Sequence, residues 1–182
     1  MKIHNTSIPH LKIIELDIFR DDRGFFVERF NKQKFADLGI PTEYFQDNFS
    51  SSIPRVVRGL HYQTPSQAKL LGCVRGRIWD VAVDIRKDSP TFGQHFSVEL
   101  SGENGKLLYV PAGFAHGFCV LGDEPADVAY KVDNPYSAAG DGGIAFDDAD
   151  LAINWPVKNP IVSDKDQKMQ SFAEYKINPV FK

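Results

Sequence analysis

The sequence predicts a mainly β protein, a sandwich or barrel of the jelly-roll type with a few short helices. Three observations favour this fold class. Turn-forming residues recur at short intervals along the 182 residues, the segments between them alternate apolar and polar side chains, and long helical patterns are absent. Aromatic residues make up 12% of the chain, with 14 phenylalanines, and aromatic side chains are enriched in strands.

The strands are expected between clusters of Gly, Pro, Asn and Asp, which predict turns at residues 21–24, 87–90, 101–105 and 139–143. The alternation is clearest at residues 78–85, where Trp79, Val81, Val83 and Ile85 fall on one face. In chain order, the strand candidates are residues 25–30, 55–62, 78–85, 95–100, 107–110 and 128–132.

Two short helices are expected. One covers residues 32–38, with Asn31 as its N-cap and Gly39 just past its end. The other begins after Ser163. A chain of this length with no repeat, low-complexity tract or linker predicts a single domain over residues 1–182.

Charge and composition exclude several classes of protein. The 21 Lys and Arg against 24 Asp and Glu give a net charge of −3, which argues against a nucleic-acid or membrane-surface partner. No apolar run approaches the roughly 18 residues of a membrane span, and residues 1–10 lack a signal-peptide core. Cys73 and Cys119 do not form a CxxC pair, so we expect small core residues of a cytoplasmic protein.

One stretch of the sequence resembles a signature of the cupin barrels. Residues 105–116 match a glycine, five residues and then PxGxxH, a strand whose Pro-Gly turn aims His116 into the barrel. In metal-binding cupins this histidine joins an HxH pair and a glutamate, but here Gln63 stands where the second histidine of that pair would be. His61 and His116 supply only two of the three or four ligands that a transition metal needs, so no metal is expected.

The two histidines have a structural and a chemical interpretation. A lone buried histidine is most commonly a hydrogen-bonded structural residue. His61 and His116, however, are expected in one barrel mouth with Arg58, Lys69 and Tyr130. A histidine free of metal titrates near neutral pH and is suited to act as an acid or a base.

Eight sequence blocks, in order, resemble the dTDP-4-dehydrorhamnose 3,5-epimerase family of the dTDP-L-rhamnose pathway. The blocks are DRGFF (22–26), FQDN (45–48), VRGLHYQ (57–63), DVAVDIR (80–86), SPTFG (89–93), VPAGFAHGF (110–118), INWP (153–156) and SDKD (163–166). The resemblance implies a cupin-type jelly roll, a homodimer without metal or cofactor, and a product used for cell-surface polysaccharide. Its substrate would be dTDP-4-dehydro-6-deoxy-D-glucose, inverted at C3 and C5 to dTDP-4-dehydro-L-rhamnose.

The resemblance also assigns catalytic roles that suit this chemistry. A C–H beside a ketone is removable only if a base takes the proton while the enolate oxygen is stabilised. His61 matches the base, Asp166 the carboxylate that orients it, Tyr130 the proton donor on the opposite face, and Lys69 the cation near the C4 oxygen. Asp166 has an alternative interpretation, because Ser163 and Asp166 also fit a capping box at a helix start.

Further positions match substrate contacts of the family. Arg23 and Arg58 match contacts to the diphosphate, for which the guanidinium fork is suited, and Tyr136 matches an aromatic residue that stacks on thymine. The remaining matches are Glu28, Gln46, Asp47, Asn48, His116, Asp141 and Lys165.

Some features depart from the family pattern. Asp141 replaces a glutamate, which shortens its reach by a methylene, and Asn134-Pro135-Tyr136 replaces a more usual pair of tyrosines. Arg58 and His61 differ by three positions, so a regular strand would point them to opposite faces. Both face a ligand only if the strand is irregular, and Gly59 is the expected place for a bulge.

Other functions stay open at this stage. A relative that epimerises a single carbon needs the same base, a metal-dependent cupin is disfavoured by Gln63, and a non-catalytic sugar-nucleotide binder is disfavoured by the set of His61, Lys69, Tyr130 and Asp166.

Overall fold

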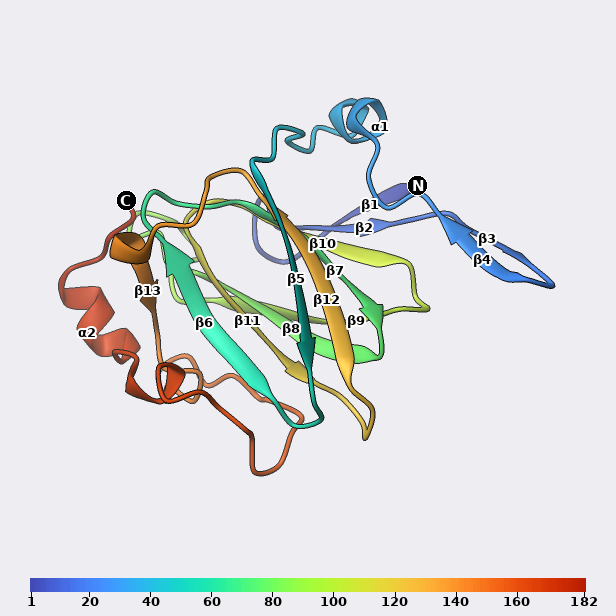
Figure 1. The fold of residues 1–182 in the computed structure, drawn as a ribbon. Coiled ribbons are helices and arrows are strands. Elements are labelled where there is room, and N and C mark those ends of the chain that lie inside the picture. Colours follow the sequence, from blue (N-terminus) through green and yellow to red (C-terminus); the bar gives the residue numbers. More distant parts are fainter.

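Two antiparallel sheets face each other in the computed structural model, which describes residues 1–182 (Figure 1). The six-stranded sheet has the order β1 (Lys2–Asn5), β2 (Lys12–Glu15), β10 (Lys106–Val110), β7 (Lys69–Arg75), β12 (Ala126–Val132) and β5 (Gln46–Ser52). The five-stranded sheet has the order β13 (Asp141–Gly143), β6 (Val57–Gln63), β11 (Phe114–Val120), β8 (Arg77–Asp84) and β9 (His95–Ser101). The predicted mainly β fold is confirmed.

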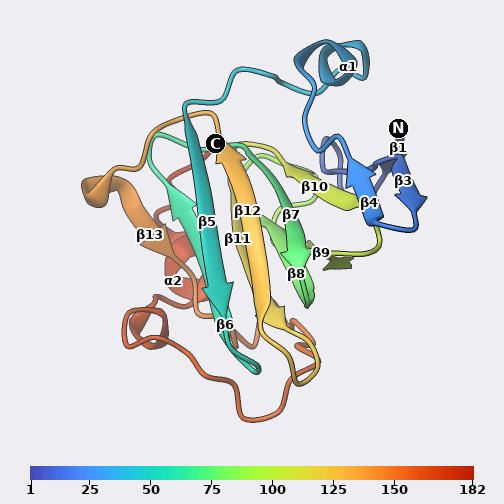
Figure 2. The same ribbon diagram turned by 45° about the vertical axis from the view of Figure 1, so that its right-hand side comes forward.

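Outside the sheets lie one hairpin and a few short helical segments. The hairpin of β3 (Ile18–Asp21) and β4 (Gly24–Val27) projects away from both sheets (Figures 1 and 2). Helix α1 (Lys32–Asp37) starts as predicted, because the Asn31 side chain accepts a hydrogen bond from the amide of Lys34 at 3.1 Å. The 3-10 turns are η1 (Ala138–Gly140) and η2 (Asp166–Lys168).

The second predicted helix is only partly correct. The chain after Ser163 forms the single 3-10 turn η2, and the α-helix α2 (Phe172–Ile177) begins nine residues after Ser163. Its capping box uses Ser171 and Glu174. The strand predicted at residues 25–30 ends early, at Val27. The turn pattern did not predict β1, β2, β3, β5, β7, β11 or β13.

Strand β8 is buried on both faces, and its alternating residues contribute to two different apolar clusters. Ile78 and Ala82 point into the core between the sheets, with Leu71, Leu108 and Phe118. Val81, Val83 and Ile85 face the other way and pack against Leu151, Phe172 and Tyr175 of the C-terminal segment. Cys73 and Cys119 are buried free thiols of this interior, as predicted.

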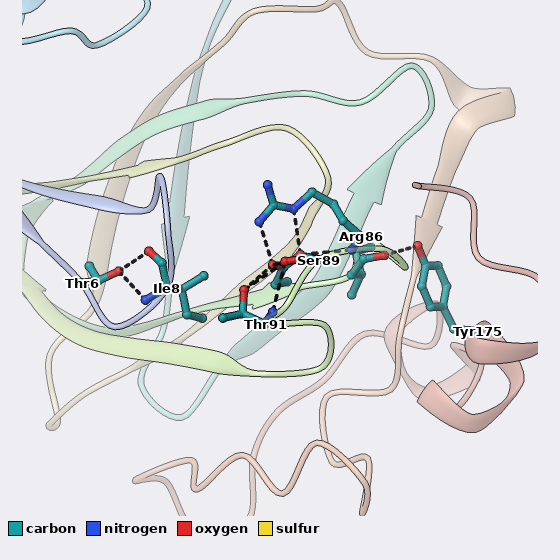
Figure 3. Close-up of polar contacts among 8 residues, drawn as sticks. Thr6, Ile8, Arg86, Ser89, Thr91 and Tyr175 are labelled. Carbon is teal, nitrogen blue, oxygen red and sulfur yellow. Dashed lines mark hydrogen bonds and ion pairs between the residues drawn. The ribbon is translucent and has the colours of Figure 1, made fainter.

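A cluster of polar side chains stabilises the loop that follows β8 (Figure 3). The fully buried Asp84 carboxylate accepts hydrogen bonds from Arg86 at 2.7 and 2.8 Å, from Ser89, and from Thr91 at 2.7 Å. The Arg86 guanidinium also lies 4.8 Å from the ring centre of Phe114. This cluster holds the loop against the start of β11, the strand that carries His116.

The pairing of β6 with β11 contains the predicted irregularity. His61 is paired with His116 and Arg58 with Phe118, so three steps along β6 match two along β11. Gly59 lies at this bulge with φ at +125°, a conformation that favours glycine. Because of the bulge, Arg58 and His61 both line one cavity despite their spacing.

Gly117, opposite the bulge, has no room for a side chain. A Cβ atom there would lie 2.6 Å from the carbonyl oxygen of Arg58 and 3.2 Å from the Cα atom of Gly59. We therefore expect Gly117→Ala to lower the free energy of unfolding by about 1–3 kcal/mol, as measured by urea unfolding. An unchanged unfolding midpoint would show that β6 and β11 separate freely at this point.

Candidate active site

Two adjoining hollows lie between the facing sheets. The central hollow has a volume of about 220 Å³ and is lined by the polar residues Ser50, Arg58, His61, Lys69, His116 and Tyr130 and by the apolar Leu71, Phe118 and Val128. The mouth hollow, also about 220 Å³, is lined by residues that include Gln46, Asn48, Gln63, Gln67, Tyr136, Asp141 and Lys165. His61, Lys69 and Tyr130 line both, so the two hollows form one continuous site.

His61 and Asp166 form a tight dyad on the side of the five-stranded sheet. The His61 Nε2 atom lies 2.7 Å from the Asp166 Oδ1 atom. Since an ionised carboxylate only accepts hydrogen bonds, Nε2 carries the proton of the neutral ring and Nδ1 keeps its lone pair. The His61 side chain is 33% exposed and the Asp166 side chain only 5%, so the dyad presents its histidine to the hollow.

The surroundings of Asp166 keep it ionised. Burial raises the pKa of this carboxyl, but the hydrogen bond and charge of His61, with a hydrogen bond from the Gly59 amide, outweigh burial and lower the pKa overall. The Asp166 amide donates to the Ser163 hydroxyl at 3.1 Å, so half of the predicted capping box is present. Its carboxylate turns to His61 instead.

Tyr130 and Lys69 approach the hollow from the opposite sheet. Tyr130 lies on β12 and Lys69 on β7, adjacent strands of the six-stranded sheet. Burial raises the pKa of the Tyr130 phenol, and the charge of Arg58 offsets this only in part. Tyr130 is therefore protonated at neutral pH and able to donate a proton from the side opposite His61.

Lys69 is a half-buried cation with no ion pair and no hydrogen bond from its ammonium group to the rest of the protein. Burial lowers its pKa to about 8, although the carboxylates of Asp80 and Asp141 raise it. An unpaired cation in a sheltered hollow is suited to stabilise negative charge that develops on a ligand.

A second histidine–carboxylate pair borders the central hollow. The His116 Nε2 atom lies 3.0 Å from both carboxylate oxygens of Asp80, which is fully buried. Sequence reasoning placed Asp80 within a family block but gave it no role. The alternation of β8, which puts this aspartate on the same face as Ile78 and Ala82, was the signal that it is buried.

At the mouth, three predicted residues contact one another. The Asp141 carboxylate accepts a hydrogen bond from the Tyr136 hydroxyl at 3.2 Å and pairs with the ammonium of Lys165. Burial raises the pKa of Asp141, but the bond and charge of Lys165 outweigh burial and lower it overall. Asp141 is thus at the mouth despite its shorter side chain, and Tyr136 is 58% exposed there.

Three predicted site residues lie away from both hollows. Arg23, at the tip of the projecting hairpin, pairs with Asp21 at 2.6 Å and its side chain is 91% exposed. Glu28 pairs with Lys34 at 2.7 Å, and Asp47 pairs with Lys131 at 3.0 Å on the outer face of the six-stranded sheet. Within one chain the structure does not bring these three to the site.

A larger hollow of about 500 Å³ at the far end of the sheets lacks the matching chemistry. Its arginines are already paired, Arg75 with Asp127 and Arg77 with Glu99, and no histidine lines it. Nor does the chain bring together three or more His, Cys, Asp or Glu side chains in a group that could hold a metal ion.

Comparisons with known proteins show the family of this chain. The profile of the dTDP-4-dehydrorhamnose 3,5-epimerase family matches residues 5–174. A dTDP-4-dehydrorhamnose 3,5-epimerase of Shigella flexneri is 50% identical over 177 residues, which are 96% of this chain and 97% of that protein. A dTDP-4-dehydrorhamnose 3-epimerase of Streptomyces niveus is 38% identical over 157 residues, 85% of this chain and 75% of that protein.

Among solved structures, a dTDP-6-deoxy-D-glucose-3,5-epimerase from Legionella pneumophila Philadelphia 1, in complex with dTDP-4-keto-L-rhamnose, is similar over most of its length. The TM-score is 0.91 at 46% sequence identity, and the match covers 94% of this chain and 93% of that one.

Proposed function

Because the chain belongs to the dTDP-4-dehydrorhamnose 3,5-epimerase family, we propose that the central hollow is where two carbons flanking a C4 ketone are inverted. The activity is that of an isomerase acting on dTDP-4-dehydro-6-deoxy-D-glucose. The observation that carries the assignment of the site is the placement of its groups. A histidine–aspartate dyad lies on one sheet, and a phenol and a free cation lie on the facing sheet.

His61 is the base. Its Nδ1 atom is free, because Nε2 is bonded to Asp166, and it takes the proton from the carbon beside the ketone. The imidazolium that results is stabilised by the Asp166 carboxylate at 2.7 Å. Asp166 also fixes the ring in the tautomer that leaves Nδ1 free to accept the proton.

Lys69 stabilises the enolate, and Tyr130 completes the inversion. As the proton leaves, charge develops on the C4 oxygen, and the unpaired Lys69 ammonium neutralises it. Tyr130, on the facing sheet, then donates a proton to the opposite face of the same carbon. This route needs no metal or cofactor, because base, oxyanion partner and acid are all side chains of this chain.

The charge of Lys69 predicts the alkaline limit of activity. A lysine with a pKa of about 8 is charged below that pH and loses its charge above it, so kcat should fall as pH rises from 7.5 to 9.5. Lys69→Arg keeps a charge over this range, so whatever activity it retains should stay level. A wild-type kcat that is flat to pH 9.5 would contradict the role of Lys69.

The mouth hollow binds the nucleotide part of the substrate. Arg58, at the edge of the central hollow, contacts the diphosphate, and Tyr136 stacks on the thymine ring. Gln46, Asn48, His116, Asp141 and Lys165 supply further contacts. Support comes from their shared lining of the continuous site.

Arg23, Glu28 and Asp47 are explained if the protein is a homodimer. The projecting hairpin exposes Phe19, Phe25 and Phe26 by 63%, 49% and 67%, and exposed aromatic clusters are typical of interfaces. Arg23, at the tip of this hairpin, reaches a substrate only in the site of a second copy.

The dimer is expected in the cytoplasm, where its product supplies cell-surface polysaccharide or lipopolysaccharide. No helix of the chain is long and apolar enough to cross a membrane.

Proton NMR of the reaction in D2O tests this function. The 3,5-epimerase incorporates solvent deuterium at both C3 and C5, because each carbon passes through an enolate. A single-carbon epimerase, the activity named for the Streptomyces niveus relative, would label one carbon only. Deuterium at one position therefore contradicts the double epimerisation, and deuterium at neither contradicts the enolate mechanism.

A further inference from the structure

The loop that carries Tyr136 is tied to both sheets by two glutamines. This loop, residues 133–140, connects β12 of the six-stranded sheet with β13 of the five-stranded sheet (Figure 1). The amide of Tyr136 donates to the side-chain carbonyl of Gln46 at 3.0 Å. The next amide, of Ser137, donates to the side-chain carbonyl of Gln63, also at 3.0 Å.

The two glutamines come from opposite sides of the site. Gln46 begins β5, at the edge of the six-stranded sheet, and Gln63 ends β6 in the five-stranded sheet. Gln63 is only 7% exposed, so its side chain has little room to turn and bond with another group. Two consecutive amides are therefore fixed from both sides, and the Tyr136 backbone between the sheets is fixed with them.

Neither glutamine carbonyl is fully free for a ligand. The Gln46 carbonyl holds the Tyr136 amide, and its Nε2 group donates to the Asn48 side chain at 2.7 Å. Gln63 occupies the position at which a metal-binding cupin has its second histidine. A polar group at this position thus anchors the loop.

We propose that Gln63 is a positioning residue for the nucleotide: with Gln46 it seats Tyr136 at the mouth of the site. The inference rests on the proposed function, because it takes the dTDP part of the substrate to be the ligand of Tyr136. Gln63 acts on binding and not on the proton transfers, which occur at His61 and Tyr130 in the central hollow.

Gln63→Met tests this role, because methionine keeps the length of the side chain and removes the carbonyl. Loss of one hydrogen bond should raise the Kd of dTDP and the KM of the sugar nucleotide by roughly 3- to 10-fold. We expect kcat to stay within about twofold of wild type. The matched control is Gln33→Met, since Gln33 donates to the Asp37 side chain at 2.8 Å on helix α1, lines neither hollow and should change neither constant.

A double-mutant cycle shows whether Gln63 acts through Tyr136. In a Tyr136→Ala background, Gln63→Met should cause no further rise in the Kd of dTDP, because the side chain it positions is gone. Effects that multiply in the double variant would overturn the proposal, and so would wild-type dTDP binding by Gln63→Met. Gln63→Leu removes the same carbonyl with a shorter side chain and provides the same test if Gln63→Met does not fold.

The two hypotheses fail in different measurements. Calorimetric binding of dTDP does not depend on turnover. A chain that binds dTDP through Gln63 and Tyr136 but epimerises nothing would contradict the proposed function alone. A chain that epimerises normally while Gln63→Met leaves Kd and KM unchanged would contradict the positioning role alone.

Discussion

Replacing His61 with asparagine is expected to lower kcat by about 10²- to 10⁴-fold, the usual contribution of a general base. Asparagine is polar and of similar size, so the fold and the affinity for dTDP should stay close to wild type. The loss should include exchange of substrate C–H for deuterium, because His61 is the group that removes the proton. Proton NMR in D2O measures exchange and inversion in one experiment.

His95→Asn is the matched control for this substitution. His95 lies on β9 and lines neither hollow, so its loss should leave kcat unchanged. If His61→Asn keeps more than about half of the wild-type activity, His61 is not the base.

Asp166→Asn separates the two interpretations of that residue. A smaller loss of kcat than in His61→Asn supports its role in orienting the ring, as the 2.7 Å contact indicates. A fall in melting temperature with normal turnover would instead support a purely structural cap next to Ser163.

Tyr130→Phe is expected to uncouple exchange from inversion. The substitution removes one oxygen and keeps the ring, so packing and nucleotide affinity should change little. His61 and Lys69 remain, so the variant should still exchange substrate C–H for deuterium. It should form little inverted product, with a loss of about 10²- to 10⁴-fold, because His61 returns the proton to the face from which it came.

Tyr109→Phe provides the control for Tyr130→Phe. Tyr109 is a buried tyrosine of β10 that lines neither hollow, and its loss should leave inversion intact. If Tyr130→Phe inverts at the wild-type rate, another group is the acid. If it loses exchange as well, the phenol acts earlier, on the enolate oxygen.

Local patterns in the sequence predicted much of the fold. The alternation of β8 and the cap at Asn31 are signals within a few residues, and both strand and helix lie where they were expected. Among the strands that were missed, β7 and β11 are largely buried and lack a clear two-residue period. Strands β1, β2, β3 and β13 have only three or four residues, and β5 is mostly polar. The second helix was placed too early because Ser163 and Asp166 resemble a capping box, but the dyad with His61 takes the carboxylate.

The family blocks contain His61 and Asp166, whereas Lys69 and Tyr130 lie between blocks and were assigned only by the resemblance over the whole chain. The structure brings His61, Lys69 and Tyr130 to one hollow, with Asp166 hydrogen-bonded to His61, although the four are far apart in the sequence. Local spacing did not reveal the loop-holding role of Gln63, because the backbone amide that it accepts from is 74 residues away. Nor could one chain's sequence show that Arg23 would lie far from the hollow, since that depends on where the hairpin projects.

The most direct test of the central claim, that base and acid act on opposite faces of one sugar carbon, is a crystal structure with the dTDP-4-dehydro sugar bound. The account predicts that the C3–C4–C5 edge lies in the central hollow, with the His61 Nδ1 atom and the Tyr130 hydroxyl on opposite faces of the ring. The Lys69 ammonium should be within hydrogen-bonding distance of the C4 oxygen. A sugar bound with His61 and Tyr130 on the same face, or bound outside the hollow, would contradict it.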